Sequence, residues 1–133
     1  MSHETPTPNN DLTILGNTVR GAVQSVETFA RPAGCDRVRI DVDEFTSFCP
    51  KTGQPDFATL RIEYIPSARC VETKSLKLYL QSFRERGHFV EALAEEIADH
   101  LQSKLEAQEL VVNIQQSTRG GMRITAIAVR SAS

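Results

Sequence analysis

The spacing of hydrophobic residues changes twice along this chain, and this change limits the folds that are open to it. Apolar residues alternate with polar ones over 37–45 and over 57–65, which is typical of half-buried β-strands. Over 89–105 they recur at every fourth position, which is typical of an amphipathic helix. Alternation returns over 122–129, so the order ends, as it begins, with strands.

Three shorter segments complete this order. Residues 75–85 have a partly helical spacing and contain neither Pro nor Gly, so we expect a helix there. Residues 110–114 are mostly apolar and precede a turn around Gly120 and Gly121, which predicts another strand. Residues 46–56 are the expected loop between the first two strands. The order strand, strand, helix, helix, strand, strand indicates an α+β fold, a four-stranded, mostly antiparallel sheet with both helices on one face.

The bulk properties indicate a single domain. The chain has 133 residues, and we place the domain at 12–133, behind a disordered lead at 1–11. No apolar run approaches the roughly 20 residues of a transmembrane helix, and the lead lacks the features of a signal peptide, so we expect a cytoplasmic protein. The net charge of −2 gives no general attraction to nucleic acid. Because the two open sheet edges are a liability for a monomer, pairing of copies into a ring is favoured.

The three cysteines, Cys35, Cys49 and Cys70, are an odd number without a C-x-x-C spacing. A disulfide framework and a four-ligand zinc site are therefore disfavoured, and we expect no metal. Cys49 differs from the others because it opens the turn-forming run C-P-K-T-G-Q-P-D, which ends at Asp56. This run places a thiol and a carboxylate at the edge of the predicted sheet.

Both residues have two interpretations. Cys49 is either a nucleophile, activated by the charge of nearby Lys51, or an inert buried thiol. Asp56 is either a proton donor to a reacting group or a turn or capping residue. Taken singly, the structural interpretation is favoured for each of them, and also for Cys35 and Cys70.

Other polar residues also admit structural roles. Thr73 or Ser75 can cap a helix whose two lysines, Lys74 and Lys77, are either solvated or bound to phosphate. Glu91 suits the first turn of a helix electrostatically.

Two histidines and one glycine turn complete the candidates. His88 and His100 form no ligand pair, and we expect both at the surface. The run Arg119-Gly120-Gly121 is either an anion site or a tight hairpin turn, and the hairpin is the simpler interpretation.

Four segments together resemble one family. They are F-T-S-F-C-P-K-T-G-Q-P-D-F, V-E-T-K-S-L-K-L-Y, S-F-R-x-R-G-x-F-x-E and R-G-G, and the resemblance spans roughly residues 12–130. The chain resembles the single-domain QueF nitrile reductases, the NADPH-dependent 7-cyano-7-deazaguanine reductases of queuosine biosynthesis. The resemblance implies the tunnelling fold, in which subunits form a pentameric barrel that can stack into a decamer. It also implies active sites between subunits.

The resemblance further implies a mechanism. Cys49 matches the family nucleophile, which adds to the nitrile carbon and gives a thioimide, and Asp56 matches the proton donor to the nitrile nitrogen. NADPH reduces the thioimide, Cys49 leaves, and a second NADPH reduces the resulting imine to 7-aminomethyl-7-deazaguanine. Covalent capture suits a nitrile because it has no acyl leaving group.

The binding residues are also implied by the resemblance. Glu91 matches the glutamate that holds the guanine-like face of the base, and Val71, Glu72 and Thr73 match a segment that contacts the substrate. Thr73 replaces the usual Ser and keeps its hydroxyl. Val90 stands where many members have a His, so its imidazole contribution is absent from this chain.

The cofactor and the rival functions complete the expectations. Lys74 and Lys77 belong to the family motif associated with NADPH, and their charge fits its phosphates. One rival is an enzyme that uses the same thioimide with ammonia to form an amidine on archaeal transfer RNA. The intact E-T-K-S-L-K-L-Y segment favours NADPH instead. The other rival is a non-catalytic ring protein that binds purines, which the absent His makes conceivable.

Overall fold

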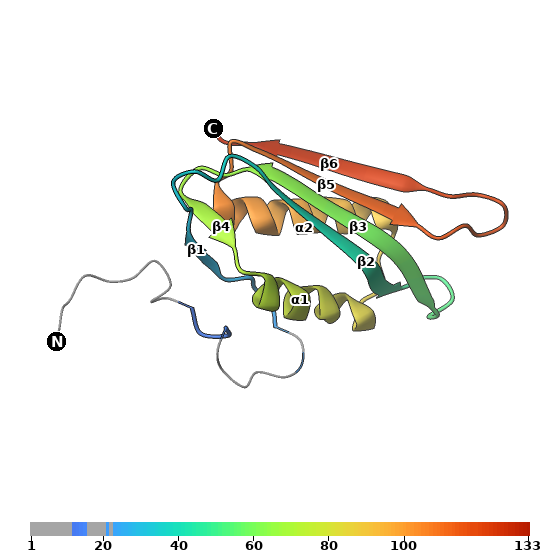
Figure 1. Ribbon diagram of the computed structural model, residues 1–133. Helices are drawn as coiled ribbons and strands as arrows, with labels where there is room; N and C mark the ends of the chain where they lie inside the picture. The colour runs from blue at the N-terminus through green and yellow to red at the C-terminus, as the bar shows by residue number, and fades with distance from the viewer. Residues whose placement is uncertain (1–11, 16–20, 22) are drawn as a thin grey trace.

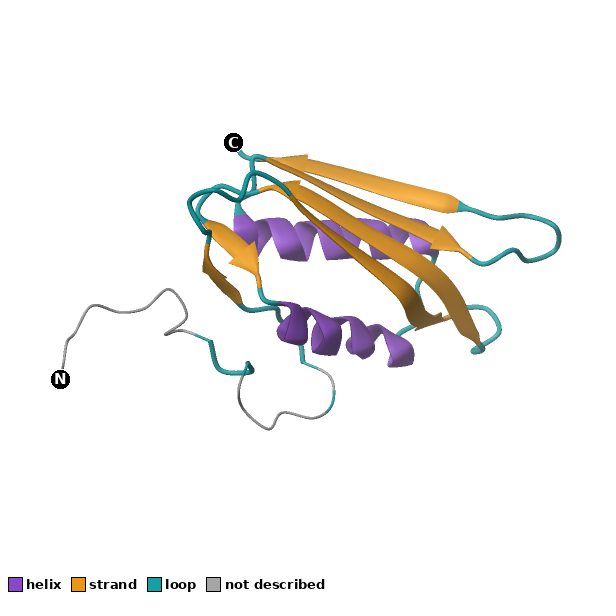
Figure 2. Ribbon diagram, viewed as in Figure 1, coloured by secondary structure: helices purple, strands orange, loops and turns teal. Residues whose placement is uncertain are grey.

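The protein, described by a computed structural model, consists of one large sheet with helices on one of its faces (Figures 1 and 2). The structure describes residues 12–15, 21 and 23–133. The large sheet has four antiparallel strands in the order β2-β3-β5-β6. Its strands are β2 (Val38–Phe48), β3 (Pro55–Ile65), β5 (Glu109–Gln116) and β6 (Thr125–Ser131). Helices α1 (Thr73–Gln81) and α2 (Val90–Leu105) and the 3₁₀ turn η1 (Ser82–Glu85) lie between β3 and β5 in the chain. The predicted α+β arrangement is confirmed.

The hydrophobic core lies between this sheet and the helices α1 and α2. Strand β3 alternates strictly between buried and exposed residues, so every second side chain faces the helices. Helix α2 buries the stripe that its period predicts, including Leu93, Ile97 and Leu101. Within the described part of the chain, no helix is long and apolar enough to cross a membrane.

Strands β2 and β3 are longer than the sequence indicated, and the expected loop 46–56 is correspondingly shorter. β2 continues to Phe48 and β3 begins at Pro55, with Phe48 and Pro55 as cross-strand partners. The alternation ends early in the sequence because the inward positions near the turn are the polar residues Ser47 and Asp56, which are also partners. Main-chain pairing continues where the apolar signal stops.

A second, small sheet was not predicted. It pairs β1 (Thr28–Ala30) with β4 (Arg69–Val71) in antiparallel register. Strands of three residues are too short to show an alternation, so the sequence carries no signal for them. Helix α1 follows β4 at once and begins at Thr73, two residues before the expected start at Ser75. The expected disordered lead, 1–11, lies outside the described residues.

The prediction that both histidines lie at the surface is wrong. His88 is partly buried between Phe83, whose ring centre is 6.3 Å away, and Glu96. His100 stacks on Tyr79 with ring centres 4.4 Å apart, and its Nε2 accepts the backbone N–H of Val26 at 3.1 Å. His100 therefore ties α2 to the segment before β1, and it can do so only as a neutral imidazole.

The pKa of His100 is lowered by burial and then by the charge of Lys104, while Glu96 opposes the shift. A lowered pKa in the folded state means that unfolding takes up a proton below the unfolded value of about 6.5. We therefore expect the free energy of unfolding to fall as pH drops below that value. Urea unfolding at pH above and below it, at one protein concentration, measures this loss. In His100→Gln the loss should be smaller than in the wild type, and an equal loss in both would contradict the assignment.

Candidate active site at the β2–β3 turn

Cys49 lies at the first position of a closed turn between β2 and β3. Its backbone N–H donates to the carbonyl of Gln54 at 2.8 Å, and its carbonyl accepts the N–H of Gly53 at 2.9 Å. Gly53 has a φ of 70°, a left-handed conformation that favours glycine. The turn thus fixes the backbone of Cys49, and the residue remains only partly buried.

The turn also lowers the pKa of the thiol. The pKa of Cys49 is lowered chiefly by a hydrogen bond from the Thr52 side chain, and further by the backbone N–H groups of Thr52 and Lys51. Desolvation and the nearby charge of Asp56 oppose this shift. The sequence suggested that Lys51 acts through its ammonium group, whereas in the structure its contribution comes from its backbone N–H. A thiol with a lowered pKa and solvent access is the form of cysteine that attacks electrophiles.

Asp56 lies beside this turn and points into the protein. It is the second residue of β3, and only 5% of it is exposed. Its carboxylate forms an ion pair with the guanidinium of Arg119, which lies in the hairpin between β5 and β6. A buried carboxylate needs such a partner or hydrogen-bond donors. The structure therefore brings the predicted thiol and acid together and adds a cation.

The start of α2 lies at the same end of the sheet as Cys49. The backbone N–H of Phe48 donates to Arg86, at 3.3 Å, and the carbonyl of Phe48 accepts from His88, at 3.2 Å. Gly87 packs so closely on Pro50 that a Cβ added to it would lie 3.2 Å from the Pro50 Cα. These contacts hold the first turn of α2 near the cysteine turn.

Glu91 and Val90, both predicted to bind substrate, have opposite surroundings in that first turn. Glu91 is exposed at this end of the molecule, where its carboxylate also suits the helix N-terminus. Val90 is 4% exposed and packs within the hydrophobic core. Of these two residues in the single chain, Glu91 is the one whose side chain is exposed to solvent.

The other predicted substrate residues surround the start of α1. The carboxylate of buried Glu72 caps the helix by accepting the N–H groups of Lys74, at 2.8 Å, and Ser75, at 2.7 Å. The sequence had proposed Thr73 or Ser75 as the cap. Val71, Glu72 and Thr73 line a largely apolar hollow of about 560 Å³, together with Cys35 and Cys70.

The predicted cofactor residues lie on α1 itself. Lys77 is exposed and lines a groove between α1 and the free edge of β2, which it shares with Arg84. The Nζ of Lys74 lies 3.4 Å from the carbonyl of Ile14. The groove has a volume of about 280 Å³, and Glu44 also lines it. Its two cations, Lys77 and Arg84, suit a phosphate or another anionic part of NADPH, and the rest of such a molecule would extend beyond the groove.

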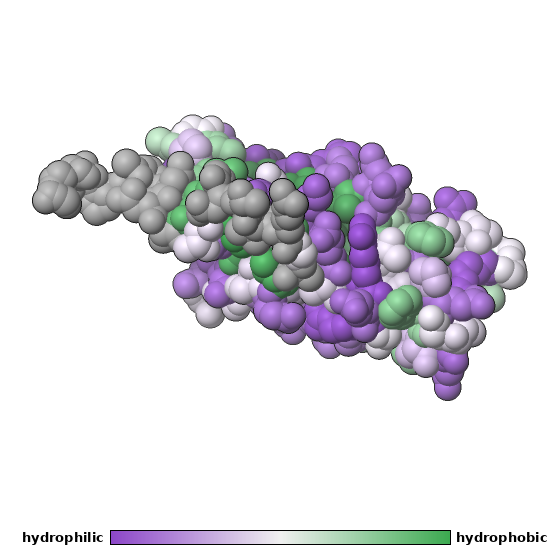
Figure 3. All heavy atoms as spheres, turned by 90° about the horizontal axis from the view of Figure 1, so that it is seen from below, coloured by the Kyte–Doolittle hydropathy of each residue, from purple (hydrophilic) through white to green (hydrophobic). Residues whose placement is uncertain are grey.

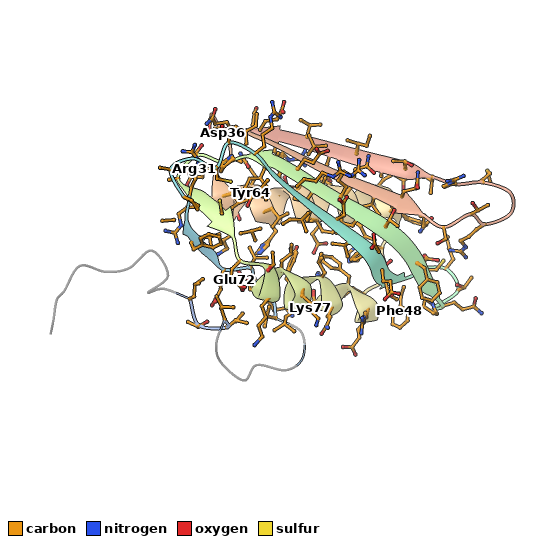
Figure 4. The ribbon with its side chains drawn as sticks, viewed as in Figure 1. Arg31, Asp36, Phe48, Tyr64, Glu72 and Lys77 are labelled. Carbon is orange, nitrogen blue, oxygen red and sulfur yellow. The ribbon has the colours of Figure 1, made fainter. Side chains whose placement is uncertain are left out.

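The single chain does not bring all the predicted residues together. Figure 4 shows Glu72 and Phe48 at opposite ends of α1, with Lys77 between them. Helix α1 has nine residues and is therefore about 13 Å long. Cys49 directly follows Phe48, so the cysteine group and the segment 71–73 are separated by about the length of this helix.

Among the residues of this end, sequence reasoning missed Thr52 and the role of Arg119. Both belong to motifs that the sequence identifies, Thr52 as part of a turn and Arg119 as part of a run that is either an anion site or a hairpin. The hairpin interpretation of the R-G-G run is confirmed, since Arg119 and Met122 exchange backbone hydrogen bonds of 2.8 and 2.9 Å. Gly120 and Gly121 have φ of 58° and 79°, as this tight turn requires. The hairpin in turn carries Arg119 to Asp56.

The other two cysteines have less reactive surroundings. Burial is the main cause that raises the pKa of Cys70, which disfavours its thiolate. Cys35 is partly buried, and its Sγ lies 3.7 Å from the carbonyl of Arg37. Among the described residues, no group of three or more His, Cys, Asp and Glu could hold a metal ion.

Comparisons with known proteins point to one family. A family model described as QueF-like protein matches residues 55–133. The NADPH-dependent 7-cyano-7-deazaguanine reductase of Frankia casuarinae is 50% identical over 115 residues, covering 86% of this chain and 92% of that protein. Its namesakes from Alkalilimnicola ehrlichii and Thioalkalivibrio sulfidiphilus are 46% and 47% identical, each covering 79% of this chain and 83% of the relative.

A solved structure supports the same fold. The archaeosine synthase QueF-Like in the apo form matches with a TM-score of 0.68, at 22% sequence identity. The match covers 75% of this chain and 97% of that chain. At this level of identity the likeness concerns the architecture alone.

The geometry of the cysteine turn predicts how its reactivity depends on Thr52. Thr52→Val removes the hydroxyl that contributes most to the lowered pKa of Cys49, so that pKa should rise toward its ordinary value. Lys51→Ala keeps the backbone N–H and should have a smaller effect. The pH dependence of Cys49 alkylation by iodoacetamide, followed by mass spectrometry, measures both. A larger effect of Lys51→Ala would mean that the ammonium group is the main activator.

Proposed function

The chain belongs to the QueF-like protein family, and on that basis we propose that it reduces 7-cyano-7-deazaguanine to 7-aminomethyl-7-deazaguanine with NADPH, in queuosine biosynthesis. Relatives that are 40–50% identical over most of the chain carry this activity in their names. The observation that carries the proposal is the activated thiol of Cys49 beside the buried carboxylate of Asp56. A nitrile needs a strong nucleophile and a proton for its nitrogen, and these two groups can supply both.

The proposed reaction begins with covalent capture. The Cys49 sulfur adds to the nitrile carbon and forms a thioimide, while Asp56 delivers a proton to the nitrile nitrogen. NADPH supplies the hydride for each of the two reductions. Between them the C–S bond breaks, and Cys49 leaves as a thiolate that its hydrogen-bond donors in the turn stabilise.

Binding of the base is assigned to two carboxylates. One is the exposed Glu91 in the first turn of α2, and the other is Glu72, which caps α1. The Glu91 carboxylate can accept two N–H groups of a guanine-like ring and so orient it for attack. Val71, Glu72 and Thr73 contact the substrate from the hollow at the start of α1. Val90 belongs to the proposed substrate-binding segment through its backbone, because its side chain is buried.

The cofactor is assigned to the cationic groove along α1. We propose that Lys74 and Lys77 hold the phosphates of NADPH, since both lie on the helix that borders this groove. An exposed lysine such as Lys77 can approach a phosphate without disturbing the core.

We propose that residues 12–133 form a single cytoplasmic domain that assembles into a pentameric barrel, alone or stacked as a decamer. Three observations support assembly: β2 and β6 are open edges, the site residues lie at both ends of α1, and large apolar side chains are exposed. Three of these, Phe57, Phe89 and Met122, belong to the end that carries Cys49. Figure 3 shows separate hydrophobic patches toward this end among mostly hydrophilic residues.

The proposed function is tested by mixing the protein, 7-cyano-7-deazaguanine and NADPH. We expect the NADPH absorbance band to fall and the amine to appear, at two NADPH per nitrile. A covalent adduct without NADPH oxidation would indicate the amidine-forming alternative instead. Binding of the base without an adduct would indicate a non-catalytic purine-binding protein.

The thiol assignment predicts different behaviour for the three cysteines. Incubation with the nitrile alone should add the mass of one substrate to the wild type, and Cys49→Ala should abolish this adduct. Cys35→Ala and Cys70→Ala are matched controls and should keep it, because neither thiol lies in the activated turn. Loss of the adduct in all three variants would contradict the assignment of Cys49.

The separation of the two residue groups predicts that neighbouring subunits share each site. Cys49→Ala and Glu72→Gln should each be inactive alone, and Gln keeps one acceptor oxygen for the cap of α1. Mixing equal amounts under dissociating and then reassociating conditions should restore about a quarter of the wild-type rate, because that share of neighbouring pairs carries both intact residues. No recovery in a mixed oligomer would show that each site lies within one chain.

A further inference from the structure

The ion pair between Arg119 and Asp56 joins two parts of the chain that are 63 residues apart. The carboxylate is almost fully buried, whereas 49% of the Arg119 side chain is exposed. Two further contacts hold the hairpin that carries the arginine. The N–H of Ser117 donates to the carbonyl of Phe57 at 2.9 Å, and Arg119 exchanges backbone bonds with Met122. Arg119 is therefore directed at Asp56 by the backbone around it.

The charge state of Asp56 is decisive for the proposed chemistry. The carboxylate accepts a hydrogen bond from the Arg119 guanidinium, and a carboxylate in an ion pair is an acceptor only. An ionised carboxylate cannot give a proton to the nitrile until it has received one. The neighbouring Cys49 thiol is a suitable source, because its hydrogen-bond donors from Thr52 and Lys51 stabilise the thiolate that remains.

We propose that Arg119 is a positioning residue for Asp56, holding the carboxylate aimed so that it relays the Cys49 proton to the nitrile nitrogen. This inference rests on the proposed function. The step balances without an outside acid: the S–H bond breaks, the S–C and N–H bonds form, and one π bond of the nitrile is lost. Asp56 accepts and then releases one proton and ends as it began, paired with Arg119.

This role differs from a purely structural ion pair. A structural pair would stabilise the fold, and its loss would reduce every activity in proportion to the loss of folded protein. A positioning role concerns the capture step, which takes place before any hydride transfer. The capture step can be measured alone, because the adduct forms from the nitrile without NADPH.

The test is the rate of adduct formation with 7-cyano-7-deazaguanine alone, followed by mass spectrometry. Arg119→Ala should slow it by roughly tenfold to a hundredfold, as expected for the loss of a hydrogen bond between charged groups. Arg119→Lys should retain part of the rate, and added guanidinium ion should partly restore Arg119→Ala. Arg123→Ala, which removes an exposed arginine from the same hairpin region, is the matched control and should react as the wild type does.

A double variant separates action through Asp56 from other effects. In an Asp56→Asn background, Arg119→Ala should produce no further slowing, because the residue through which it acts is already neutral. An equal slowing in both backgrounds would overturn the inference. An unchanged rate of adduct formation in Arg119→Ala would also overturn the inference. This includes the case in which the only effect of the variant is a higher KM for NADPH.

The same experiment distinguishes the two proposals. A wild-type protein that forms no adduct would overturn the proposed function itself. A wild type that forms the adduct, with Arg119→Ala reacting equally fast, would overturn only the role of Arg119. If Arg119→Ala fails to fold, Arg119→Lys decides, because a lysine cannot reproduce the planar guanidinium contact and should react more slowly than the wild type.

Discussion

The antiparallel pairing of β2 with β3 is the interaction on which the candidate site depends. Its last cross-strand pair is Phe48 with Pro55, and Cys49 and Asp56 directly follow these two residues. The register of one hairpin therefore sets the separation of the proposed nucleophile and proton carrier. Phe48 also receives both backbone contacts from the segment before α2, which brings Glu91 to the same end. A shift of one residue in this pairing would turn Asp56 away from the interior.

The two buried carboxylates, Glu72 and Asp56, are similarly buried but have different hydrogen-bond partners. Glu72 accepts two backbone N–H groups and so completes the first turn of α1, which requires no charged partner. Asp56 instead faces a guanidinium from a separate hairpin, and that partner is half exposed. An interaction with a solvent-accessible side chain can respond to a ligand more readily than a buried helix cap can. This difference supports a chemical role for Asp56, whereas Glu72 caps α1 and also belongs to the proposed substrate-binding segment.

The sequence predicted the features that are local or periodic. Alternation and four-residue spacing gave the order of the main strands and helices, because burial of one face imposes these periods. The extent of β2 and β3 was underestimated, since Ser47 and Asp56 occupy inward positions without being apolar. The Arg119–Asp56 contact could not be derived, because its partners are brought together only by the register of β3, β5 and β6. The activating role of Thr52 was equally hidden, since it depends on the shape of one turn.

The separation of the two groups of proposed site residues follows from the same architecture. Helix α1 runs along the sheet, so residues before and after it must lie at opposite ends. A planar base held by Glu91 and attacked by Cys49 cannot also reach segment 71–73 of the same chain across the length of that helix. A second copy, added at an open strand edge, can supply this segment while covering exposed apolar side chains. One assembly step would thus pair the open strand edges and complete the proposed site. Oligomerisation is therefore part of the proposed mechanism.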